Sequence, residues 1–279
     1  MLKTKNQIIQ MNPISCTYHE IQALIKRLYI QTRRRPSSII SGIIQPLLWL
    51  ILFSALFQNA PVGLFKENMK YGNFLSPGII IFTTFTGSIN AGLPLMFDRE
   101  FGFLNRLLIS PLTSRDSLFI ASIFFITLIT LLQTITIILF TIIKFHNITK
   151  LHEVIYILLV TLLISLSISS ISICLAFILP GHIEFLAFIL VINLPMLFSS
   201  TALAPLYFMP YWLQMIASLN PLTYAIEMIR FIIMQTNSNV ITINTAWFHL
   251  GFHKNFLFLT LFNILSFTIT KSIISYKFE

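Results

Sequence analysis

Charged side chains are scarce in this chain of 279 residues, where Asp, Glu, Lys and Arg make up only 10%. Soluble proteins carry about a quarter of their residues as these four types. Hydrophobic residues reach 56% and the mean hydropathy is +0.85. A soluble fold would lack the polar surface to cover them, whereas helices inside lipid need no such cover. We therefore predict an all-α, polytopic membrane protein.

Cysteine and valine are also rare. The two cysteines, Cys16 and Cys174, lie before the first apolar run and inside a later one, so a disulfide is not expected. Valine occurs five times while isoleucine is abundant, although lipid hardly distinguishes the two. Packing does not explain this bias, but a coding sequence poor in G and C does, which favours an organellar or other AT-rich genome.

Several motifs of catalysis are missing. No glycine is followed by lysine, so the phosphate-binding GxxxxGK[ST] loop is absent and we expect no ATP hydrolysis by this chain itself. His249 and His253 could share a helix face and bind a metal, but the pair has no third ligand. We expect no enzyme activity, no metal site and no cofactor in this chain.

Apolar runs predict six transmembrane helices, each near the roughly 20 residues that cross a bilayer. They cover residues 38–57, 74–97, 118–143, 154–179, 185–206 and 255–275. The fifth should kink at Asn193 and Pro195. Their interiors hold almost no ionisable groups, which disfavours an ion-coupled carrier. Residues 38–279 are predicted to form one transmembrane domain, preceded by a segment at 1–37.

That first segment contains an amphipathic helix over residues 14–31. Tyr18, Ile21, Leu24, Ile25 and Leu28 recur at helical spacing, and the other face is polar. Because the helix leads into Arg33, Arg34 and Arg35, we expect it to lie on the membrane surface. A solvated basic helix without lipid contact is the alternative.

Two shorter apolar pieces, 209–217 and 222–234, lie between the fifth and sixth spans. Each is too short to cross a bilayer comfortably, and Asn220 and Pro221 separate them. They predict two re-entrant helices that dip into the outer face of the membrane.

Basic residues set the predicted orientation. With the N-terminus inside, the inner segments hold 12 of the 18 Lys and Arg residues, which places both termini on the cytoplasmic or stromal side. The net charge of +9 is then mainly a topology signal, and nucleic-acid binding is not expected.

Small polar residues within the spans allow two interpretations. Thr161, Ser165, Ser169 and Ser172 fall on one face of the fourth span, where they favour close helix packing over a stripe that lines a substrate path. Gln45, Gln133 and Asn193 are single amides that could bond between helices.

The inner loop between the second and third spans is the most charged internal stretch. Phe97, Phe101, Leu104 and Leu108 fall on one helix face, and Pro111 ends the helix. Such a short amphipathic helix would suit docking to a soluble protein, although a plain surface loop has the same spacing.

Two motifs resemble those of type-2 ABC permeases, the membrane subunits of ABC exporters. The run FDREFGFLNRLLISPLTSR resembles the inner loop of that family, and LNPLTYAIEMIR resembles its Asn-Pro-Leu-Thr-Tyr element after the fifth span. Order, separation and the six-span pattern agree with the family from about Ile14 onward. The form of the first motif is similar to the cyanobacterial and plastid branch, as in red algal plastid genomes.

The resemblance implies a coupling helix that docks a separate ATP-binding subunit. Its expected residues are Asp98, Arg99, Glu100, Gly102, Leu104, Asn105, Arg106, Leu107, Leu108 and Pro111. Arg99 and Glu100 would form ion pairs at the docking site, and the leucines would anchor the helix to the spans. The outer re-entrant element would depend on Asn220, Pro221, Tyr224 and Arg230.

The implied function is the permease subunit of an ABC exporter, working as a homodimer or pseudo-dimer with two ATPase chains that supply the ATP. The implied location is a plastid membrane, or otherwise a bacterial inner membrane. The alternative is a non-transporting membrane scaffold or assembly factor that uses the inner loop to recruit a soluble partner.

Overall fold

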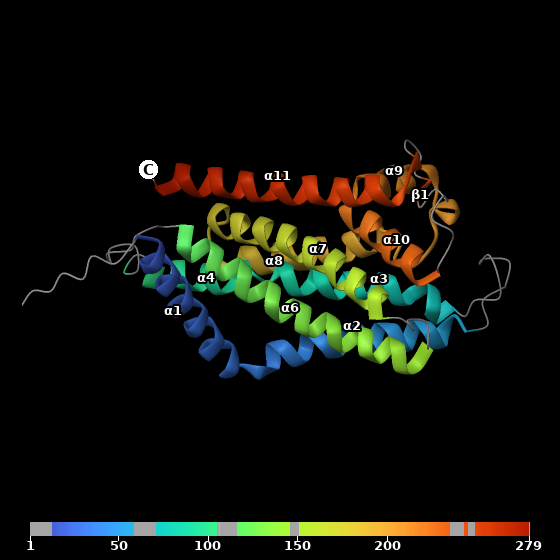
Figure 1. The fold of residues 1–279 in the computed structure, drawn as a ribbon, viewed down its shortest axis with the longest axis horizontal. Coiled ribbons are helices and arrows are strands. Elements are labelled where there is room, and N and C mark those ends of the chain that lie inside the picture. Colours follow the sequence, from blue (N-terminus) through green and yellow to red (C-terminus); the bar gives the residue numbers. More distant parts are fainter. Residues whose placement is uncertain are drawn as a thin grey trace, which may run out of the picture.

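The structure is a computed structural model that describes residues 13–58, 71–104, 106, 116–145, 151–234, 243–244 and 249–278. Its helices are α1 (Pro13–Arg33), α2 (Pro36–Leu56), α3 (Tyr71–Ile89), α4 (Gly92–Glu100), α6 (Asp116–Phe145), α7 (Leu151–Ile178), α8 (His182–Phe198), α9 (Tyr211–Leu219), α10 (Pro221–Met234) and α11 (Phe252–Phe278). A 3₁₀ turn spans Leu206–Phe208, and β1 (Ile243–Asn244) pairs antiparallel with β2 (His249–Leu250). Figure 1 shows a helical bundle, as predicted.

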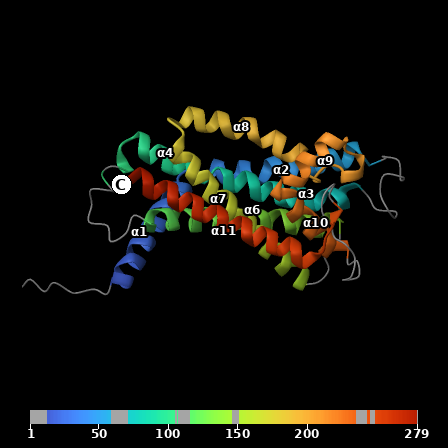
Figure 2. The same ribbon diagram turned by 90° about the horizontal axis from the view of Figure 1, so that it is seen from above.

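The bundle has two ends. α1, the end of α4, the α7–α8 turn and the end of α11 lie at one, here called the α1 end; α9, α10 and the start of α3 lie at the other, the α9 end (Figures 1 and 2). Among the described residues, five segments are long and apolar enough to cross a membrane, with α3 and α4 together forming one of them. The bent pair of α9 and α10 makes a sixth if it counts as one span, whereas α8, at the place of the fifth predicted span, is apolar but has only 17 residues.

The fifth predicted span is shorter than the sequence indicated. It was expected to reach residue 206, but α8 ends at Phe198, where Ser199 N–H donates to the carbonyl of Pro195. Pro195 lies inside the last turn and Pro205 follows, so the backbone leaves the helical ladder here instead of only kinking. Turns connect α8 to the 3₁₀ turn at Leu206–Phe208.

α9 and α10 meet at an angle of 87°. The end of α8 and the start of α11 both lie at the α9 end, so the pair between them enters and returns on one side (Figure 1). The two short helices of the predicted re-entrant element are therefore present, with α10 buried beside α3, α7 and α11. Tyr207, Tyr211 and Trp212 are exposed nearby, and such side chains are typical of a membrane–water interface.

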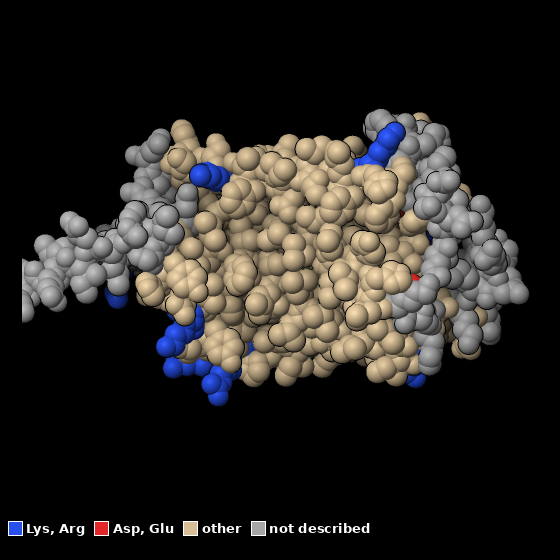
Figure 3. Space-filling view, viewed as in Figure 1, with Lys and Arg blue, Asp and Glu red and all other residues tan. Residues whose placement is uncertain are grey.

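The surface supports a membrane setting. Along α6 the exposed apolar residues form one stripe at steps of three or four, namely Ile120, Phe124, Leu128, Leu132, Ile135, Leu139 and Ile143. In Figure 3 lysine and arginine lie toward the two ends of the molecule and the middle of this face carries none. This distribution fits an apolar band that faces lipid, between two ends that are exposed to water.

The hydroxyl face of α7 is used for packing. Thr161, Ser165, Ser169 and Ser172 are all fully buried, and the first three donate to carbonyls of their own helix. The Ser172 hydroxyl instead bonds the α3–α4 break: it donates to the carbonyl of Ile89 and accepts from the N–H of Gly92. The packing interpretation of this face is thus confirmed.

Helix α1 was predicted correctly as a helix. Fewer of its apolar residues contact the bundle than the sequence pattern indicated. Leu28 is buried and α1 lies beside α6, whereas Tyr18, which the pattern placed on the apolar face, is exposed. Only the second half of α1 therefore has a bundle to pack against.

Candidate functional site

The end of α4 connects three other elements. Asp98, Arg99 and Glu100 are consecutive, so helix geometry turns their side chains about 100° from one another. Each binds a different partner: Asp98 pairs with Arg27 of α1, Arg99 binds the end of α7, and Glu100 pairs with His182 at the start of α8. We call these contacts the α4 junction.

Arg99 caps the C-terminus of α7. Its guanidinium donates to the carbonyls of Ala176 (2.8 Å), Phe177 (3.2 Å), Leu179 and Pro180 (2.6 Å). The last four carbonyls of a helix have no partner within it, and a cation there also interacts favourably with the helix dipole. In this structure the side chain expected to meet an ATPase is thus bound within its own chain, and its docking role stays a prediction.

Asp98 and Arg27 join α4 to α1. The Asp98 side chain is 11% exposed and that of Arg27 is 31% exposed, so the pair lies at the edge of the protein. The Arg27 guanidinium also lies 3.9 Å from the centre of the Phe103 ring, a cation–π contact. Arg27 therefore touches both sides of the turn that follows α4.

Glu100 and His182 join α4 to α8. The His182 Nδ1 lies 2.5 Å from Glu100 Oε2, and about a third of each side chain is exposed. The ring of Phe97 lies 5.3 Å from that of His182. Neither Arg27 nor His182 was predicted as a site residue; the amphipathic pattern of α1 indicated the region of Arg27, and no sequence signal indicated His182.

The continuous helix expected from Phe97 to Leu108 is interrupted. α4 ends at Glu100, and Gly102 has a φ of 72°, a left-handed conformation that glycine adopts easily. Its N–H donates to the carbonyl of Arg99, as in a helix C-cap. A helix register begins again at Phe103 and Leu104, so the apolar face predicted across the loop is broken at the glycine.

Beyond this turn, the structure places only part of the predicted docking set. Leu104 is buried in an apolar cluster with Leu118 and Phe177, near Leu24 of α1, as expected for an anchor. Arg106 and Phe101 are exposed, Phe101 by 75%. Asn105, Leu107, Leu108 and Pro111 lie outside the described residues.

At the other end of the molecule, Asn220 and Pro221 form the turn of the re-entrant pair. The Asn220 Oδ1 accepts from the N–H of Leu222 (3.0 Å), which makes Asn220 the N-cap of α10, and Pro221 occupies the first helical position. The Asn220 Nδ2 donates to the Met196 carbonyl (3.0 Å) and the Ser199 hydroxyl (3.2 Å). One side chain thus starts α10 and fixes it to the end of α8.

Tyr224 completes this turn. Its hydroxyl donates to the carbonyl of Ser218 at the end of α9 (2.6 Å), and its ring lies 4.4 Å from that of Phe258 in α11. Asn220 and Tyr224 of the motif that the sequence singled out therefore share one physical role, which is to hold the angle between α9 and α10.

Arg230 holds the far end of α10. It pairs with Glu227 one turn earlier, donates to the Thr201 carbonyl (2.9 Å), and lies 3.9 Å from the centre of the Phe74 ring. Only 8% of its side chain and 16% of that of Glu227 are exposed. Glu227 was not predicted as a partner, although its i,i+3 spacing from Arg230 is a signal that sequence analysis can use.

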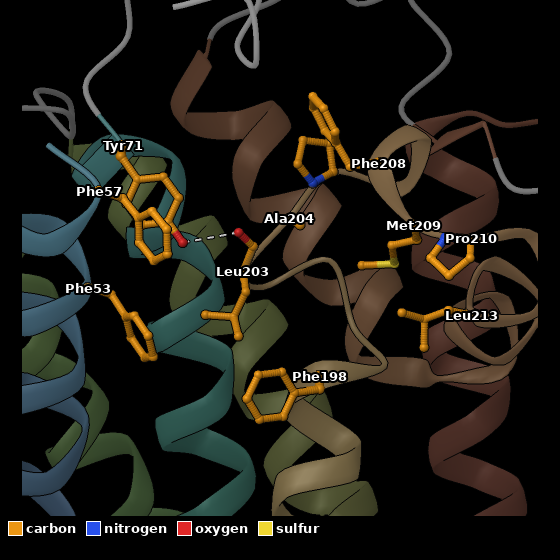
Figure 4. A pocket seen from close by; sticks show the side chains of 11 residues that line it. Phe53, Phe57, Tyr71, Phe198, Leu203, Ala204, Phe208, Met209, Pro210 and Leu213 are labelled. Carbon is orange, nitrogen blue, oxygen red and sulfur yellow. Dashed lines mark hydrogen bonds between the residues drawn. The ribbon is translucent and has the colours of Figure 1, made fainter. Parts of the chain in front are cut away.

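A cavity of about 520 Å³ lies at the α9 end. Its walls are apolar and come from α2, α3, the end of α8, the following turns and α9: Phe53, Phe57, Tyr71, Phe198, Leu203, Ala204, Pro205, Phe208, Met209, Pro210 and Leu213. Figure 4 shows Phe53, Phe57 and Tyr71 on one side and Met209, Pro210 and Leu213 on the other. The Tyr71 hydroxyl donates to the Leu203 carbonyl across the cavity wall (3.1 Å). A pocket of this size and lining fits the apolar part of a small molecule.

Comparison with known proteins decides the family. The family model described as "ABC-2 type transporter" matches residues 19–234. The chain belongs to the ABC-2 type transporter family. Both the α4 junction and the re-entrant turn lie inside the matched region, and members of this family are membrane components of transporters.

Three relatives bear the name "Putative transport permease ycf38". The protein of Porphyra purpurea is 57% identical over 79% of this chain and 76% of its own length; that of Pyropia yezoensis is 53% identical over 86% of each. The protein of Cyanophora paradoxa is 47% identical over 91% of this chain and 89% of its own. These are red algal and glaucophyte proteins encoded in plastid genomes. This agrees with the organellar or other AT-rich genome that the excess of isoleucine over valine favours.

Proposed function

We propose that this ABC-2 permease is the membrane subunit of an exporter driven by a separate ATPase. Two permease copies, identical or related, would bind two ATPase chains and move a substrate across a plastid membrane. Both termini would lie on the side of the ATPase, together with the α4 junction. The transport cycle would then alternate between states open to either side, with ATP shifting their populations.

The α4 junction is the observation that carries this proposal. A force applied to the loop after Gly102 reaches α1 through Arg27, α7 through Arg99 and α8 through Glu100. α7 and α8 run toward the α9 end, where the turns that follow α8 line the apolar cavity. A movement at the loop is therefore connected mechanically to a compartment at the opposite face.

The exposed residues of the loop supply the contact surface for a partner. Phe101 and Arg106 project from the turn, while Asp98, Arg99 and Leu104 bind within the chain. In this division of roles, Phe101 and Arg106 meet the ATPase, and the inward-facing residues transmit the movement.

Co-purification tests the docking surface. Phe101→Asp together with Arg106→Glu should abolish recovery of the ATPase with a tagged permease, because an apolar contact is lost and a charge is reversed. Tyr207→Asp, at an exposed aromatic position at the α9 end, should leave recovery unchanged. Undiminished recovery with the loop variant would refute the docking surface.

ATP turnover separates the exporter from a scaffold. The bound ATPase of an exporter should turn over more slowly when the α4 junction is altered by Asp98→Asn, whereas a scaffold would leave turnover unchanged. Transport that continues without ATP would instead indicate an ion-coupled carrier.

Cysteine labelling tests the orientation. In a chain whose native cysteines are replaced by serine, a cysteine at Lys66 should react with an impermeant thiol reagent from the outer face, and one at Ser114 should not. The reverse pattern would overturn the proposed topology.

A further inference from the structure

A second cavity, of about 330 Å³, lies where α1 meets α2. It is bounded by α2, by the break between α3 and α4, and by α6. Its polar lining residues include Thr32, Ser38, Ser41, Gln45, Asn90 and Gln133. Unlike the aromatic cavity at the α9 end, this one combines hydroxyl and amide groups with apolar walls.

Gln133 is fixed at the back of this cavity. Its side chain is almost fully buried, and Nε2 donates to the Ile39 carbonyl of α2 (3.4 Å). The amide passes between Gly42 of α2 and Gly87 of α3, and a Cβ atom at either glycine would collide with it. Both glycines therefore leave room for an amide that α6 presents to the cavity.

The open side of the cavity faces the surroundings of the protein. Ser38, Ser41, Gln45 and Asn90 line the cavity and are exposed. Polar groups at a lipid-facing position are unfavourable unless they meet other polar groups. A ligand that fits must therefore bring hydrogen-bonding groups into this part of the surface.

Positive charge lies beside the cavity in the sequence, between two of its lining residues. Thr32 lines the cavity, Arg33, Arg34 and Arg35 follow it and are exposed, and the Ser38 hydroxyl donates to the Arg35 carbonyl (3.1 Å). None of the lining residues is acidic. In Figure 3 lysine and arginine gather at the lower left, where Figure 1 shows α1 joining α2. The entrance thus favours an anion.

Apolar side chains continue from the entrance along α2. Ile40, Ile44 and Leu48 are exposed on the same helix as Ser41 and Gln45. The site therefore combines three features: exposed arginines, a polar cavity and exposed apolar side chains on the same helix. An anionic phospholipid has a matching group for each: its phosphate, the polar head group attached to that phosphate, and its acyl chains.

We propose that the cavity between α2, the α3–α4 break and α6 binds the head group of an anionic phospholipid from the leaflet beside the α1–α2 junction. Arg33–Arg35 attract the phosphate, and Gln45, Asn90 and Gln133 bind hydroxyl groups of the head group. The lipid would stabilise the junction of α1 with the spans. This site is separate from the cavity at the α9 end and does not depend on what the permease transports.

Lipid retention during purification tests the proposal. The full-length protein is reconstituted in phosphatidylcholine vesicles with a minor fraction of phosphatidylglycerol, and bound lipids are counted by native mass spectrometry after mild solubilisation. The wild type should retain phosphatidylglycerol several-fold above its share of the vesicle.

Two pairs of variants locate the site. Ser41→Trp fills the cavity and should remove the enrichment, while Ser37→Trp, an exposed α2 position outside the lining, should preserve it. Replacing Arg33–Arg35 by glutamine should lower the enrichment, because each basic residue near an anionic lipid changes binding by about fivefold. Replacing the exposed Lys26, Lys144 and Lys254 by glutamine is the control of equal charge.

The outcomes that overturn the proposal are distinct. Enrichment that survives Ser41→Trp means that the lipid binds elsewhere, and enrichment lost equally in Ser37→Trp means that it depends on the whole helix surface. Equal retention of both lipids by the wild type, or an arginine variant indistinguishable from its lysine control, excludes recognition of the anionic head group.

Discussion

The two ends of this permease hold their turns with different chemistry. At the α1 end, the α4 junction uses the ion pair Arg27–Asp98 and the contact between His182 and Glu100, whose side chains are up to 37% exposed. At the α9 end, the re-entrant turn uses the buried Asn220 and Tyr224 and a buried pair, Arg230–Glu227. Exposed ion pairs exchange partners with water at small cost, whereas buried polar groups are costly to leave unpaired.

This difference assigns different mechanical roles. Contacts that break and reform cheaply suit the end where a partner docks and a movement begins. Contacts that are costly to break suit an element that moves as one unit, and α10 is bound to α8 through Asn220 and to α3 through Arg230. We therefore expect substitutions at the α9 end to affect stability most, and those at the exposed part of the α1 end to affect coupling most.

The largest loss of stability is expected for Arg230→Met. The substitution removes the bond to Thr201 and leaves Glu227 without its partner inside the protein. Breaking one partner of a buried ion pair costs about 3–5 kcal/mol. Thermal unfolding of the purified protein in detergent should show a large decrease in Tm.

Two controls keep this prediction specific. Arg34→Met, at an exposed position, should leave Tm nearly unchanged. The double variant Glu227→Gln with Arg230→Met should recover part of the loss, because the unpaired charge is gone. A single variant as stable as Arg34→Met would mean that the buried pair does not hold the α9 end.

Arg99→Ala comes next, because Arg99 is the one member of the α4 junction that binds backbone groups. Hydrogen bonds that involve a charged group contribute about 1.5–3 kcal/mol to stability. Because Arg99 is partly exposed, we expect Arg99→Ala to lower the free energy of unfolding by an amount near the lower end of this range. Arg99→Lys should be intermediate, since it keeps the charge at the end of α7 but cannot reach several carbonyls at once. Tm is the measurement, with Arg106→Ala as the exposed control.

If Arg99→Lys and Arg99→Ala lower Tm equally, the cap depends on the geometry of the guanidinium and not on its charge.

Asn220 allows two functions of one side chain to be separated. Asn220→Ala removes the N-cap and should cost about 1 kcal/mol from that loss alone, with a further loss from the bonds to Met196 and Ser199. Asn220→Asp keeps a good cap but has no amide donor, so only the tie to α8 is removed. A variant with Asp that is as stable as the wild type would show that capping, and not the tie between α8 and α10, accounts for this residue.

How well the sequence predicts a feature of this structure depends on how far apart in the sequence the interacting residues lie. The helices followed from apolar runs, and the turn at Asn220–Pro221 from local capping preferences, because both are decided within a few residues. The end of α8 at Phe198 was missed, since whether Pro195 kinks or ends a helix depends on the packing of the turns that follow. The interruption at Gly102 was missed because the apolar spacing continued across a glycine that takes a positive φ.

Partners distant in sequence escaped prediction. Arg99 was expected to face a docking partner, yet its acceptors are backbone carbonyls some 80 residues away, and carbonyls carry no sequence signal. His182 lies in a tight turn whose position relative to Glu100 depends on how α7 packs. The same limit applies to both cavities, whose walls come from helices that the chain order alone does not bring together.

The smallest effect on stability is expected at Glu100, and it tests the comparison most directly. The Glu100–His182 pair is about one-third exposed, and such surface pairs contribute about 0.2–1 kcal/mol. Glu100→Gln should therefore change Tm little, while ATP turnover by the bound ATPase falls more than in Asn220→Asp. The reason is that Glu100 connects the loop to α8, whereas Asn220 acts after the movement has reached the α9 end. If Glu100→Gln lowers Tm as far as Arg230→Met and leaves turnover unchanged, the two ends do not differ in the way their chemistry indicates.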